Sequence, residues 1–527
     1  MVYYFGSTKT EGTKVDKMTL GGKGKNLAEM TSIGLPVPPG FTITTEVCER
    51  YYKQGEKLPD GLMKDVDKAV KTLEKELGKK FGDDSNPLLV SVRSGAAVSM
   101  PGMMNTILNL GLNDVSTEGL AKATKNERFA YDAYRRLINM YGDVVMGLEH
   151  HLFEEAFDKV KKKYKVTEDT AVPADGLRDL CNAYKAVYKK GTGQDFPQDP
   201  IEQLKLAIEA VFGSWMADRA IAYRNIEAGK GNTIIRDLVG TAVNVQAMVY
   251  GNMGDDSGTG VGFTRDPNTG QNKFYGEFLI NAQGEDVVAG IRTPQPVSQM
   301  SKWDRKAHKE LMAIKEKLET HYTDMQDIEF TIERGKLFML QTRTGKRTGV
   351  AAVKIACDMV KEKLIDEKEA VKRVPAGDLT HCLLPSFKPT ARNAADVLCR
   401  GLNASPGAAV GKLAFTAEEA KNRHADGESI ILVRRETSPE DVEGMAAASG
   451  ILTSTGGATS HAAVVARGWG KCCVAGAGEI HINEKTKKIT VCGRTFGAND
   501  TISLDGTTGE VMAGEVETQE PKLSGDF

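Results

Sequence analysis

The sequence predicts an α/β protein built from several domains. At 527 residues the chain is too long for a single hydrophobic core. Short apolar runs bounded by glycine and proline, typical of strands, recur before residue 110, at 239–343 and after residue 400. Between about residues 117 and 225, apolar residues instead recur every three or four positions, which is typical of helices.

The composition excludes several classes of function. A net charge of −2 gives no bulk attraction to nucleic acid or to an anionic membrane, so neither is expected as a partner. No apolar stretch approaches the roughly 20 residues that cross a bilayer, and the N-terminus has no signal-peptide pattern. The 8 cysteines are scattered without a C-x-x-C pair. We therefore expect no zinc site, no disulfide framework and a cytoplasmic location.

The N-terminal part is expected to combine strands with glycine-rich loops. Residues 41–44 and 87–92 are predicted strands, and a helix should follow the glycine-rich turn at 21–24. The second strand runs into a loop of small residues at 93–97. Such a loop can bring backbone N–H groups close to a phosphate.

Strands return from about residue 239. The predicted elements are a strand at 242–250, a helix at 304–321, a hairpin at 327–332 and 336–343, and a helix at 350–372. Four prolines between residues 375 and 406 indicate a connecting region. A compact α/β unit of short strands should follow and end near residue 506.

The most informative stretch lies in that last unit. Residues 450–452 predict a strand, two glycines interrupt it, and Thr459 or Ser460 is a suitable N-cap for a helix beginning near His461. An imidazole is a nucleophile near neutral pH. The first turn of a helix stabilises an anion through its unpaired N–H groups and its dipole. His461 is therefore a candidate phosphoryl acceptor.

Two carboxylates share one face of the predicted hairpin. Strand alternation puts Asp327 and Glu329 on the same side, where they suit Mg²⁺ shared with phosphates. A three-residue loop at 333–335 would bring Gln341 opposite Asp327, with Arg343 on the same side, whereas a two-residue loop would turn Gln341 away. A solvated strand face is the alternative interpretation of the two carboxylates.

Two cations accompany the glycine-rich loops. Lys23 lies in the turn at 21–24, which lacks the spacing of a P-loop, so it is either a phosphate ligand or an ordinary surface lysine. Arg93 has a guanidinium fork suited to a polyphosphate. Its strand leads into the small-residue loop at 93–97.

Several stretches together resemble the phosphoenolpyruvate-utilising enzymes, and within them the pyruvate, phosphate dikinase family. The signature is GGATSHAAVVAR at 456–467, and the supporting stretches are GGKGKNLAEM at 21–30, SVRSG at 91–95, SMPGMM at 99–104, QGEDVVAG at 283–290 and TSPED at 437–441. The resemblance covers nearly the whole chain. One departure is Asn105, where the family usually has Asp.

The resemblance implies an ATP-grasp nucleotide-binding region with a helical insertion, followed by a swivelling phosphohistidine α/β domain. The implied domains are ATP-grasp segments at 1–116 and 226–345 around a helical insertion at 117–225, a helical linker region at 346–400, a phosphohistidine domain at 401–515, and the start of a further linker at 516–527. The family continues into a C-terminal barrel that binds pyruvate and phosphoenolpyruvate. That barrel is expected to lie beyond Phe527.

The implied reaction converts ATP, phosphate and pyruvate to AMP, diphosphate and phosphoenolpyruvate through a phosphohistidine at His461. Without the barrel, the chain is expected to perform the ATP and phosphate half-reaction, with Mg²⁺ as cofactor. Full-length members are expected to be homodimers. In some members a regulatory kinase and phosphatase act at the position of Thr459.

Candidate site residues follow from these arguments and from the resemblance. The nucleotide-binding candidates are Lys23, Arg93, Gly95, Ser99, Gly102, Asp327, Glu329, Gln341 and Arg343. The expected metal ligands among them are Asp327, Glu329 and Gln341. Thr453 is expected to hydrogen-bond phosphate near His461, and Arg467 to form a surface ion pair.

Two other functions remain open. A phosphoenolpyruvate synthase uses water in place of phosphate, so it forms AMP with phosphate instead of diphosphate. A non-catalytic phosphocarrier or regulatory fragment would bind ATP without transferring a phosphoryl group to His461. A serine hydrolase is disfavoured, because Ser460 does not lie in a G-x-S-x-G sequence.

Overall fold

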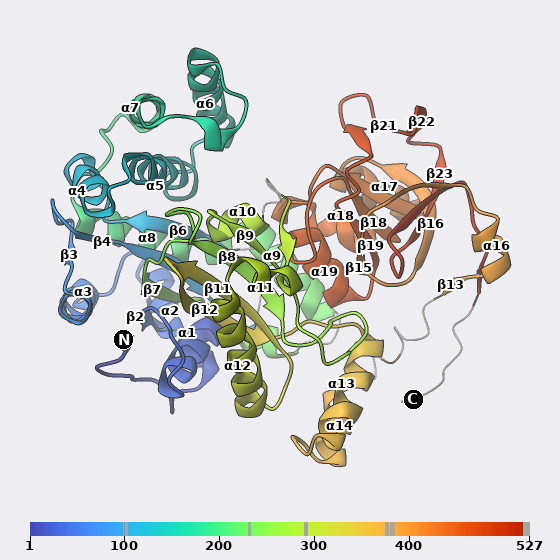
Figure 1. Cartoon of the computed structure of the whole chain (residues 1–527), viewed down its shortest axis with the longest axis horizontal. Coiled ribbons are helices and arrows are strands. Elements are labelled where there is room, and N and C mark those ends of the chain that lie inside the picture. Colours follow the sequence, from blue (N-terminus) through green and yellow to red (C-terminus); the bar gives the residue numbers. More distant parts are fainter. Residues whose placement is uncertain are drawn as a thin grey trace. The chain divides into compact units, whose positions relative to one another are not determined.

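The computed structural model describes residues 1–98, 100, 104–229, 233–288, 293–374, 379 and 385–519 (Figure 1). The chain divides into two compact units. The first contains Met1–Met253 and Phe338–Gln341, and the second contains Gly254–Leu337 and the chain from Thr342 onward. None of the helices among the described residues is long and apolar enough to cross a membrane.

The first unit is built on an antiparallel sheet. Its hydrogen-bonded order is β1 (Val2–Phe5), β2 (Gly40–Ile43), β7 (Ala242–Ala247), β5 (Val90–Gly95) and β6 (Thr106–Leu110). A short pair, β3 (Lys80–Phe81) and β4 (Pro87–Leu88), precedes β5. Every residue of the central strand β7 is buried. The predicted strand at 242–250 is therefore present but ends three residues earlier, at Ala247.

Helices of the first unit form where apolar residues recur at helical spacing. In α3 (Leu62–Leu77), Leu62, Val66, Val70 and Leu73 are buried, and the charged residues between them lie toward solvent. The other elements are α1 (Lys17–Ser32), α2 (Thr45–Lys53), α4 (Asp114–Thr124), α5 (Glu127–Met140), the π-helix η1 (Tyr141–Val145), α6 (His150–Tyr164), η2 (Asp169–Ala171), α7 (Ala174–Thr192), α8 (Pro200–Gly213), η3 (Ser214–Met216), α9 (Asp218–Gly229) and η4 (Thr233–Asp237). The predicted helical pattern after residue 117 is confirmed.

The second unit begins with another antiparallel sheet. Its order is β10 (Gln295–Pro296), β9 (Tyr275–Ile280), β8 (Gly258–Phe263), β11 (Gln326–Glu333) and β12 (Lys336–Thr344). Its helices are α10 (Gly284–Val288), η5 (Val297–Gln299), α11 (Met300–Trp303), α12 (Arg305–Tyr322), α13 (Gly349–Lys361) and α14 (Glu367–Arg373). The predicted helix at 304–321 is α12, and the predicted helix at 350–372 is two helices with a break between them.

A third sheet follows residue 396. Its order is β14 (Val397–Arg400), β24 (Glu510–Ala513), β23 (Thr501–Asp505), β16 (Ala408–Ala414), β17 (Ile430–Arg434), β18 (Gly450–Thr453), β19 (Cys472–Ala475) and β15 (Leu402–Ser405). Strands β16 to β19 are parallel neighbours and the flanking pairs are antiparallel. Its core contains the fully buried Ile431, Val433, Leu452 and Val474.

Short elements complete this part of the chain. They are α16 (Pro389–Asn393), α17 (Ala417–Ala425), η6 (Pro439–Asp441), α18 (Val442–Ala447), α19 (His461–Trp469), the strands β20 (His481–Asn483), β21 (Lys488–Val491) and β22 (Arg494–Gly497), and the pair β13 (Ser386–Phe387) with β25 (Thr518–Gln519). The short strands and helices predicted after residue 400 are present, and the strands of this sheet continue to Ala513, past the predicted end near residue 506. Its separation as a domain stays a prediction.

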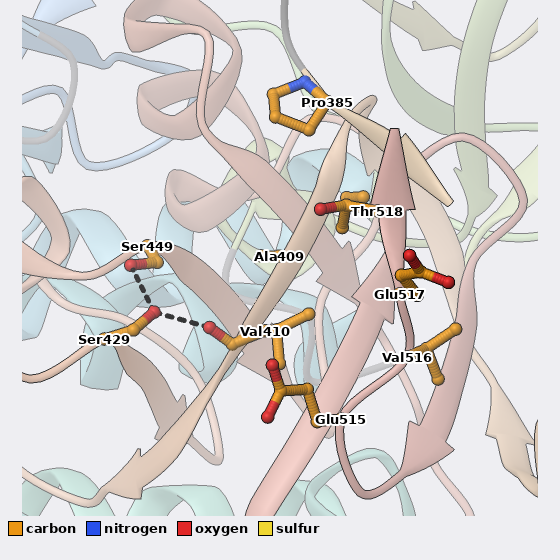
Figure 2. A pocket seen from close by; sticks show the side chains of 10 residues that line it. Pro385, Ala409, Val410, Ser429, Ser449, Glu515, Val516, Glu517 and Thr518 are labelled. Carbon is orange, nitrogen blue, oxygen red and sulfur yellow. Dashed lines mark hydrogen bonds between the residues drawn. The ribbon is translucent and has the colours of Figure 1, made fainter. Parts of the chain in front are cut away.

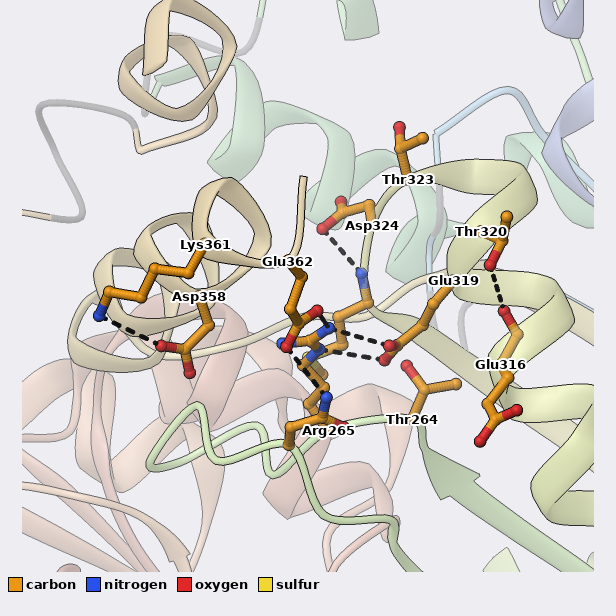
Figure 3. Close-up of polar contacts among 12 residues, drawn as sticks. Thr264, Arg265, Glu316, Glu319, Thr320, Thr323, Asp324, Asp358, Lys361 and Glu362 are labelled. Atoms are coloured by element: carbon orange, nitrogen blue, oxygen red, sulfur yellow. Dashed lines mark hydrogen bonds and ion pairs between the residues drawn. The ribbon is translucent and has the colours of Figure 1, made fainter. Parts of the chain in front are cut away.

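An ion network joins the end of β8 to α12 and to the end of α13 (Figure 3). Arg265 donates from Nε and Nη2 to Glu319 at 3.2 and 3.0 Å, and from Nη1 and Nη2 to Glu362 at 3.2 and 2.6 Å. The side chain of Arg265 is fully buried and that of Glu319 is 7% exposed. Because buried charges need partners, the network fixes α13, which begins the connecting segment, to the sheet.

Removing Arg265 should therefore destabilise the chain strongly. Arg265→Met retains much of the volume but leaves the Glu319 carboxylate buried without its partner, which should cost about 3–5 kcal/mol of unfolding free energy. Denaturant unfolding of the whole chain measures this. Asp67→Asn, which removes an exposed pair with Lys71, should change stability by less than about 0.5 kcal/mol. Equal effects of the two substitutions would contradict the anchoring role.

Candidate functional site

The candidate nucleophile lies where a central parallel strand ends. Strand β18 ends at Thr453 and helix α19 begins at His461, with Gly456 at a φ of 103° in the intervening loop. The Ser460 side chain accepts a hydrogen bond from the N–H of Ala463 at 3.4 Å. This confirms the predicted N-cap and places His461 in the first helical turn.

The two ring nitrogens of His461 have different surroundings. Thr437 Oγ1 lies 3.0 Å from Nδ1, whereas Nε2 is buried and has no hydrogen-bond partner in the described part of the chain. Burial lowers the pKa of His461 to about 4, opposed by the carboxylates of Asp441 and Glu440 and assisted by the charge of Lys346. The imidazole is therefore neutral near pH 7. When Nδ1–H donates to Thr437, Nε2 carries the lone pair.

Two threonines near His461 have different roles in this structure. The Thr453 hydroxyl donates to the Thr455 carbonyl at 2.8 Å and accepts from the Gly476 N–H at 3.4 Å, so it shapes the loop. Its predicted contact with phosphate stays a prediction. The Thr459 side chain is 9% exposed, and its buried hydroxyl has no hydrogen-bond partner among the described residues.

The prediction for Arg467 is wrong. Instead of forming a surface ion pair, its side chain is 1% exposed and donates from Nε to the Ala404 carbonyl at 3.1 Å and from Nη2 to the Ala458 carbonyl at 2.8 Å. The guanidinium also lies over the Phe263 ring, 5.3 Å from its centroid. Arg467 thus ties the loop before α19 to β15 and contacts β8. In the sequence, the apolar residues that precede Arg467 in the helix are the signal that could have indicated its burial.

Glu277, on β9, is a site residue that sequence reasoning missed. Its Oε2 accepts a hydrogen bond from the Ala458 N–H at 3.2 Å, and a methyl group on Gly457 would lie 2.3 Å from the same oxygen. Burial raises the pKa of Glu277, and the Ala458 N–H and the charge of Arg467 oppose that rise. No local pattern marks this contact, because 181 residues separate Glu277 from Ala458.

In the first unit, two glycines bring helix α1, which carries Lys23, against the end of β5. Gly21 interrupts α1 with a φ of 68°, and a methyl group on it would lie 1.6 Å from the Gly95 carbonyl oxygen. A methyl group on Gly95 would lie 3.3 Å from Cβ of Lys23. Only glycine permits this crossing. It places Cβ of Lys23 close to Gly95. The turn predicted at 21–24 before a helix instead lies within α1, which is kinked at Gly21.

Arg93 lies next to Asn105, the position where an Asp is usual in the family that the sequence resembles. It pairs with Thr106 across β5 and β6, so Asn105 is its near neighbour. The Asn105 carboxamide oxygen accepts a 2.7 Å hydrogen bond from Nη2 of Arg219 on α9. The amide therefore binds a guanidinium without neutralising its charge. Ser99 and Gly102 lie outside the described residues, and their predicted roles stay predictions.

The carboxylates of Asp327 and Glu329 belong to β11, which pairs with β8 in the second sheet. Asp327 is 6% exposed, and Nε of Arg343 donates to its Oδ2 at 2.7 Å. Burial raises the pKa of Asp327 against the opposing charge of Arg343, and the neighbouring Glu329 adds to the rise. The predicted Asp327–Arg343 proximity is confirmed. A solvated strand face does not describe Asp327.

The turn of this hairpin is shorter than predicted. Strand β11 ends at Glu333 and β12 begins at Lys336, and the loop residues Arg334 and Gly335 have φ values of 49° and 71°. Two positive φ values are those of a two-residue type I′ turn, so the predicted three-residue loop is wrong. If side chains alternated without interruption from this turn, Gln341 would lie on the opposite face of the sheet from Asp327.

The register changes before the open end of the hairpin. A uniform register would place Met325 opposite Thr344, but the Gly345 N–H donates to the Met325 carbonyl at 3.0 Å. One extra residue in β12, a β-bulge, accounts for the shift, and the consecutive buried residues Gln341 and Thr342 indicate its place. The bulge returns Arg343 to the Asp327 face. The predicted role of Gln341 stays a prediction.

The donor set fits Mg²⁺. Carboxylate and carboxamide oxygens are ligands that Mg²⁺ accepts, usually together with phosphate oxygens. Arg343 is hydrogen-bonded to one oxygen of Asp327, and burial of this carboxylate favours a further compensating cation. Among the described residues, no three His, Cys, Asp or Glu side chains group as a metal site. The metal assignment stays a prediction.

A pocket of about 350 Å³ lies beside the starts of β17 and β18 in the third sheet (Figure 2). Ser429 and Ser449 precede β17 and β18, whereas His461 follows the far end of β18. The Ser429 hydroxyl hydrogen-bonds to Ser449 at 3.0 Å and to the Val410 carbonyl. This pocket therefore lies at the opposite end of the parallel strands from His461 and is not formed by that residue.

Comparisons with known proteins agree with this arrangement. The family model described as "Pyruvate phosphate dikinase, AMP/ATP-binding domain" matches residues 17–60, 56–305 and 298–364. The model described as "PEP-utilising enzyme, mobile domain" matches residues 427–509. The first covers the strands and helices that hold Lys23, Arg93 and Asp327, and the second covers the segment that holds His461.

Curated relatives match along nearly the whole chain. The pyruvate, phosphate dikinase of Clostridium symbiosum is 56% identical over 518 residues, which are 98% of this chain and 59% of the relative. The chloroplastic pyruvate, phosphate dikinase of Mesembryanthemum crystallinum and pyruvate, phosphate dikinase 2 of Zea mays are each 54% identical over 526 residues, all of this chain and 55% and 59% of the relatives. The chain spans somewhat over half the length of these relatives. It belongs to the pyruvate, phosphate dikinase family.

Proposed function

We propose that this chain catalyses the ATP- and phosphate-dependent half of a dikinase reaction, in which His461 becomes phosphorylated. The observation that carries the proposal is the buried, neutral His461 at the start of α19, with Nδ1 beside Thr437 and Nε2 without a partner among the described residues. The names of the relatives supply the substrates: phosphate as one acceptor and pyruvate as the other.

The proposed chemistry has two steps on this chain. The Nε2 lone pair of His461 attacks the β-phosphorus of ATP, the bond to the α,β-bridging oxygen breaks, and AMP leaves with that electron pair. Phosphate then attacks the γ-phosphorus of the diphosphoryl group on His461, and the bond from that phosphorus to the β,γ-bridging oxygen breaks, with its electron pair staying on the oxygen of the β-phosphoryl group. Diphosphate leaves, one phosphoryl group stays on Nε2, and in the complete reaction that group passes to pyruvate to give phosphoenolpyruvate.

Individual residues have defined tasks in this proposal. Thr437 holds the ring so that Nε2 points toward the reacting phosphorus, and Lys23, Arg93 and Arg343 neutralise charge that builds on the phosphates. Asp327 and Glu329, with Gln341, would hold Mg²⁺. When bound, the metal supplies further positive charge at the phosphate oxygens.

Thr459 is the proposed regulatory position. A phosphate there would compete for the same helix end and repel a phosphoryl group on His461. Because the Thr459 hydroxyl is buried, a regulatory kinase would reach it only after the surrounding residues move away.

The first test concerns the nucleophile. His461→Asn preserves a polar side chain but removes Nε2, so acid-labile labelling by ATP carrying ³²P at the β-position should disappear. Equilibrium nucleotide binding, measured by calorimetry, should stay near the wild-type value. Full labelling of this variant would disprove the assignment. Formation of phosphate in place of diphosphate by the wild type would favour the synthase, and ATP binding without labelling would favour a phosphocarrier.

The second test concerns the strand carboxylates. Glu329→Ala should slow Mg²⁺-dependent labelling by at least about 100-fold, as expected for loss of electrostatic stabilisation at the reacting centre. Its unfolding free energy should change little. Glu316→Ala, at an exposed position of α12, is the matched control and should label normally. Normal labelling of Glu329→Ala would remove Glu329 from the site.

The low pKa of His461 predicts a pH dependence of stability. The folded-state pKa of about 4 lies below the ordinary value of 6.5, so between these values the unfolded chain binds a proton that the folded chain does not. The corresponding stability is complete above about pH 6.5 and is lost as pH falls through 4. Denaturation at several pH values should show wild type losing stability relative to His461→Asn in that window. Parallel profiles would contradict the buried, neutral ring.

A further inference from the structure

The helix that carries His461 meets side chains of opposite charge near its two ends. Before the helix begins, the Glu277 carboxylate accepts the Ala458 N–H at 3.2 Å. In the last turn, Lys346 lies against Gly468, where a methyl group would be 3.0 Å from both Nζ and Cδ of the lysine. Glu277 occupies the corresponding space beside Gly457.

The order of these charges matches the electrical polarity of α19. A helix carries partial positive charge at its N-terminal end and partial negative charge at its C-terminal end, so a carboxylate is favourable near the first and an ammonium near the second. The helix ends at Trp469, with Gly470 as a left-handed C-cap. The Lys346 ammonium therefore lies beside the end where the last carbonyl groups are exposed.

The chain on both sides of Lys346 is held in place. The preceding Gly345 N–H donates to the Met325 carbonyl at 3.0 Å. The following Arg347 donates from both terminal nitrogens to Asp324, each at 2.7 Å. Anchored neighbours limit the backbone motion of Lys346, so its ammonium is presented to α19 from a defined direction.

We infer that Lys346 is a positioning residue for phosphoryl transfer. Its ammonium sits beside Gly468 at the C-terminal end of α19 and, with Glu277 at the other end, sets the direction in which His461 faces the carboxylate-bearing sheet. One contact alone would let the helix pivot, whereas two contacts near its opposite ends define its orientation. If α19 ran in the opposite direction, Glu277 would lie near its C-terminal end and Lys346 near its N-terminal end, and both charges would be unfavourable there. The inference rests on the proposed function, because orientation matters only for a transfer step.

An independent consequence is electrostatic. The positive charge of Lys346 contributes to lowering the pKa of His461. Replacing the lysine with an uncharged residue should therefore raise the pKa of His461, which NMR titration of the ring protons measures. A lysine that merely filled space would leave the titration unchanged when replaced by methionine.

The decisive experiment compares Lys346→Met, Lys346→Arg and wild type in single-turnover labelling from ATP, with calorimetric ATP binding beside it. Lys346→Met should slow labelling by about 3- to 30-fold, the range for a charge at a partly buried helix end, with an unchanged ATP dissociation constant. Lys346→Arg should restore most of the rate. Lys485→Met, at an exposed turn position between β20 and β21, is the matched control and should label at the wild-type rate.

A second variant separates positioning from stability. Gly468→Ala improves helix propensity, so a purely structural view predicts unchanged or higher thermal stability and unchanged labelling. The inference predicts slower labelling because the new methyl group displaces Lys346, and no further slowing when Gly468→Ala is added to Lys346→Met. A wild-type labelling rate for Lys346→Met overturns the inference while leaving the proposed function intact. Absence of labelling in the wild type overturns the proposed function itself.

Discussion

The structure around His461 depends on keeping an imidazole neutral inside a largely buried site. Burial disfavours the charged ring, and Thr437 provides the hydrogen bond that Nδ1 requires. Everything near the ring follows from this requirement. The N-cap at Ser460 starts the helix, the loop glycines allow a sharp approach to it, and the helix end provides a favourable place for negative charge without protonating the nucleophile.

The same helix and the loop before it also contact several distant segments of the chain. Arg467 donates to carbonyl groups of the loop before α19 and of β15, so the loop and helix behave as one piece. Glu277 and Lys346 contact this piece from segments far away in the sequence. Under the proposed function, phosphoryl transfer would require docking of a rigid element, which is a simpler demand than ordering a flexible loop around ATP.

Much of this arrangement could be predicted from local patterns. The strand at 450–452, the N-cap, the helix at His461 and the central strand β7 all follow from apolar periodicity and capping residues. The hairpin was predicted, but its loop length was not. Glu-Arg-Gly permits both a two- and a three-residue turn, and the β-bulge that restores Arg343 to Asp327 depends on packing several residues away. Glu277 and the buried state of Arg467 could not be found locally, since tertiary contacts create them.

The crossing of Gly21 and Gly95 limits which substitutions this part of the first unit can tolerate. A side chain at Gly21 would collide with a backbone oxygen, which cannot rotate aside as a flexible side chain can. The shape of this loop pair is therefore a fixed template. Under the proposed function, directed evolution toward other nucleoside triphosphates would have to work through exchangeable side chains such as that of Lys23. Libraries that randomise the two glycines should consist mostly of inactive clones.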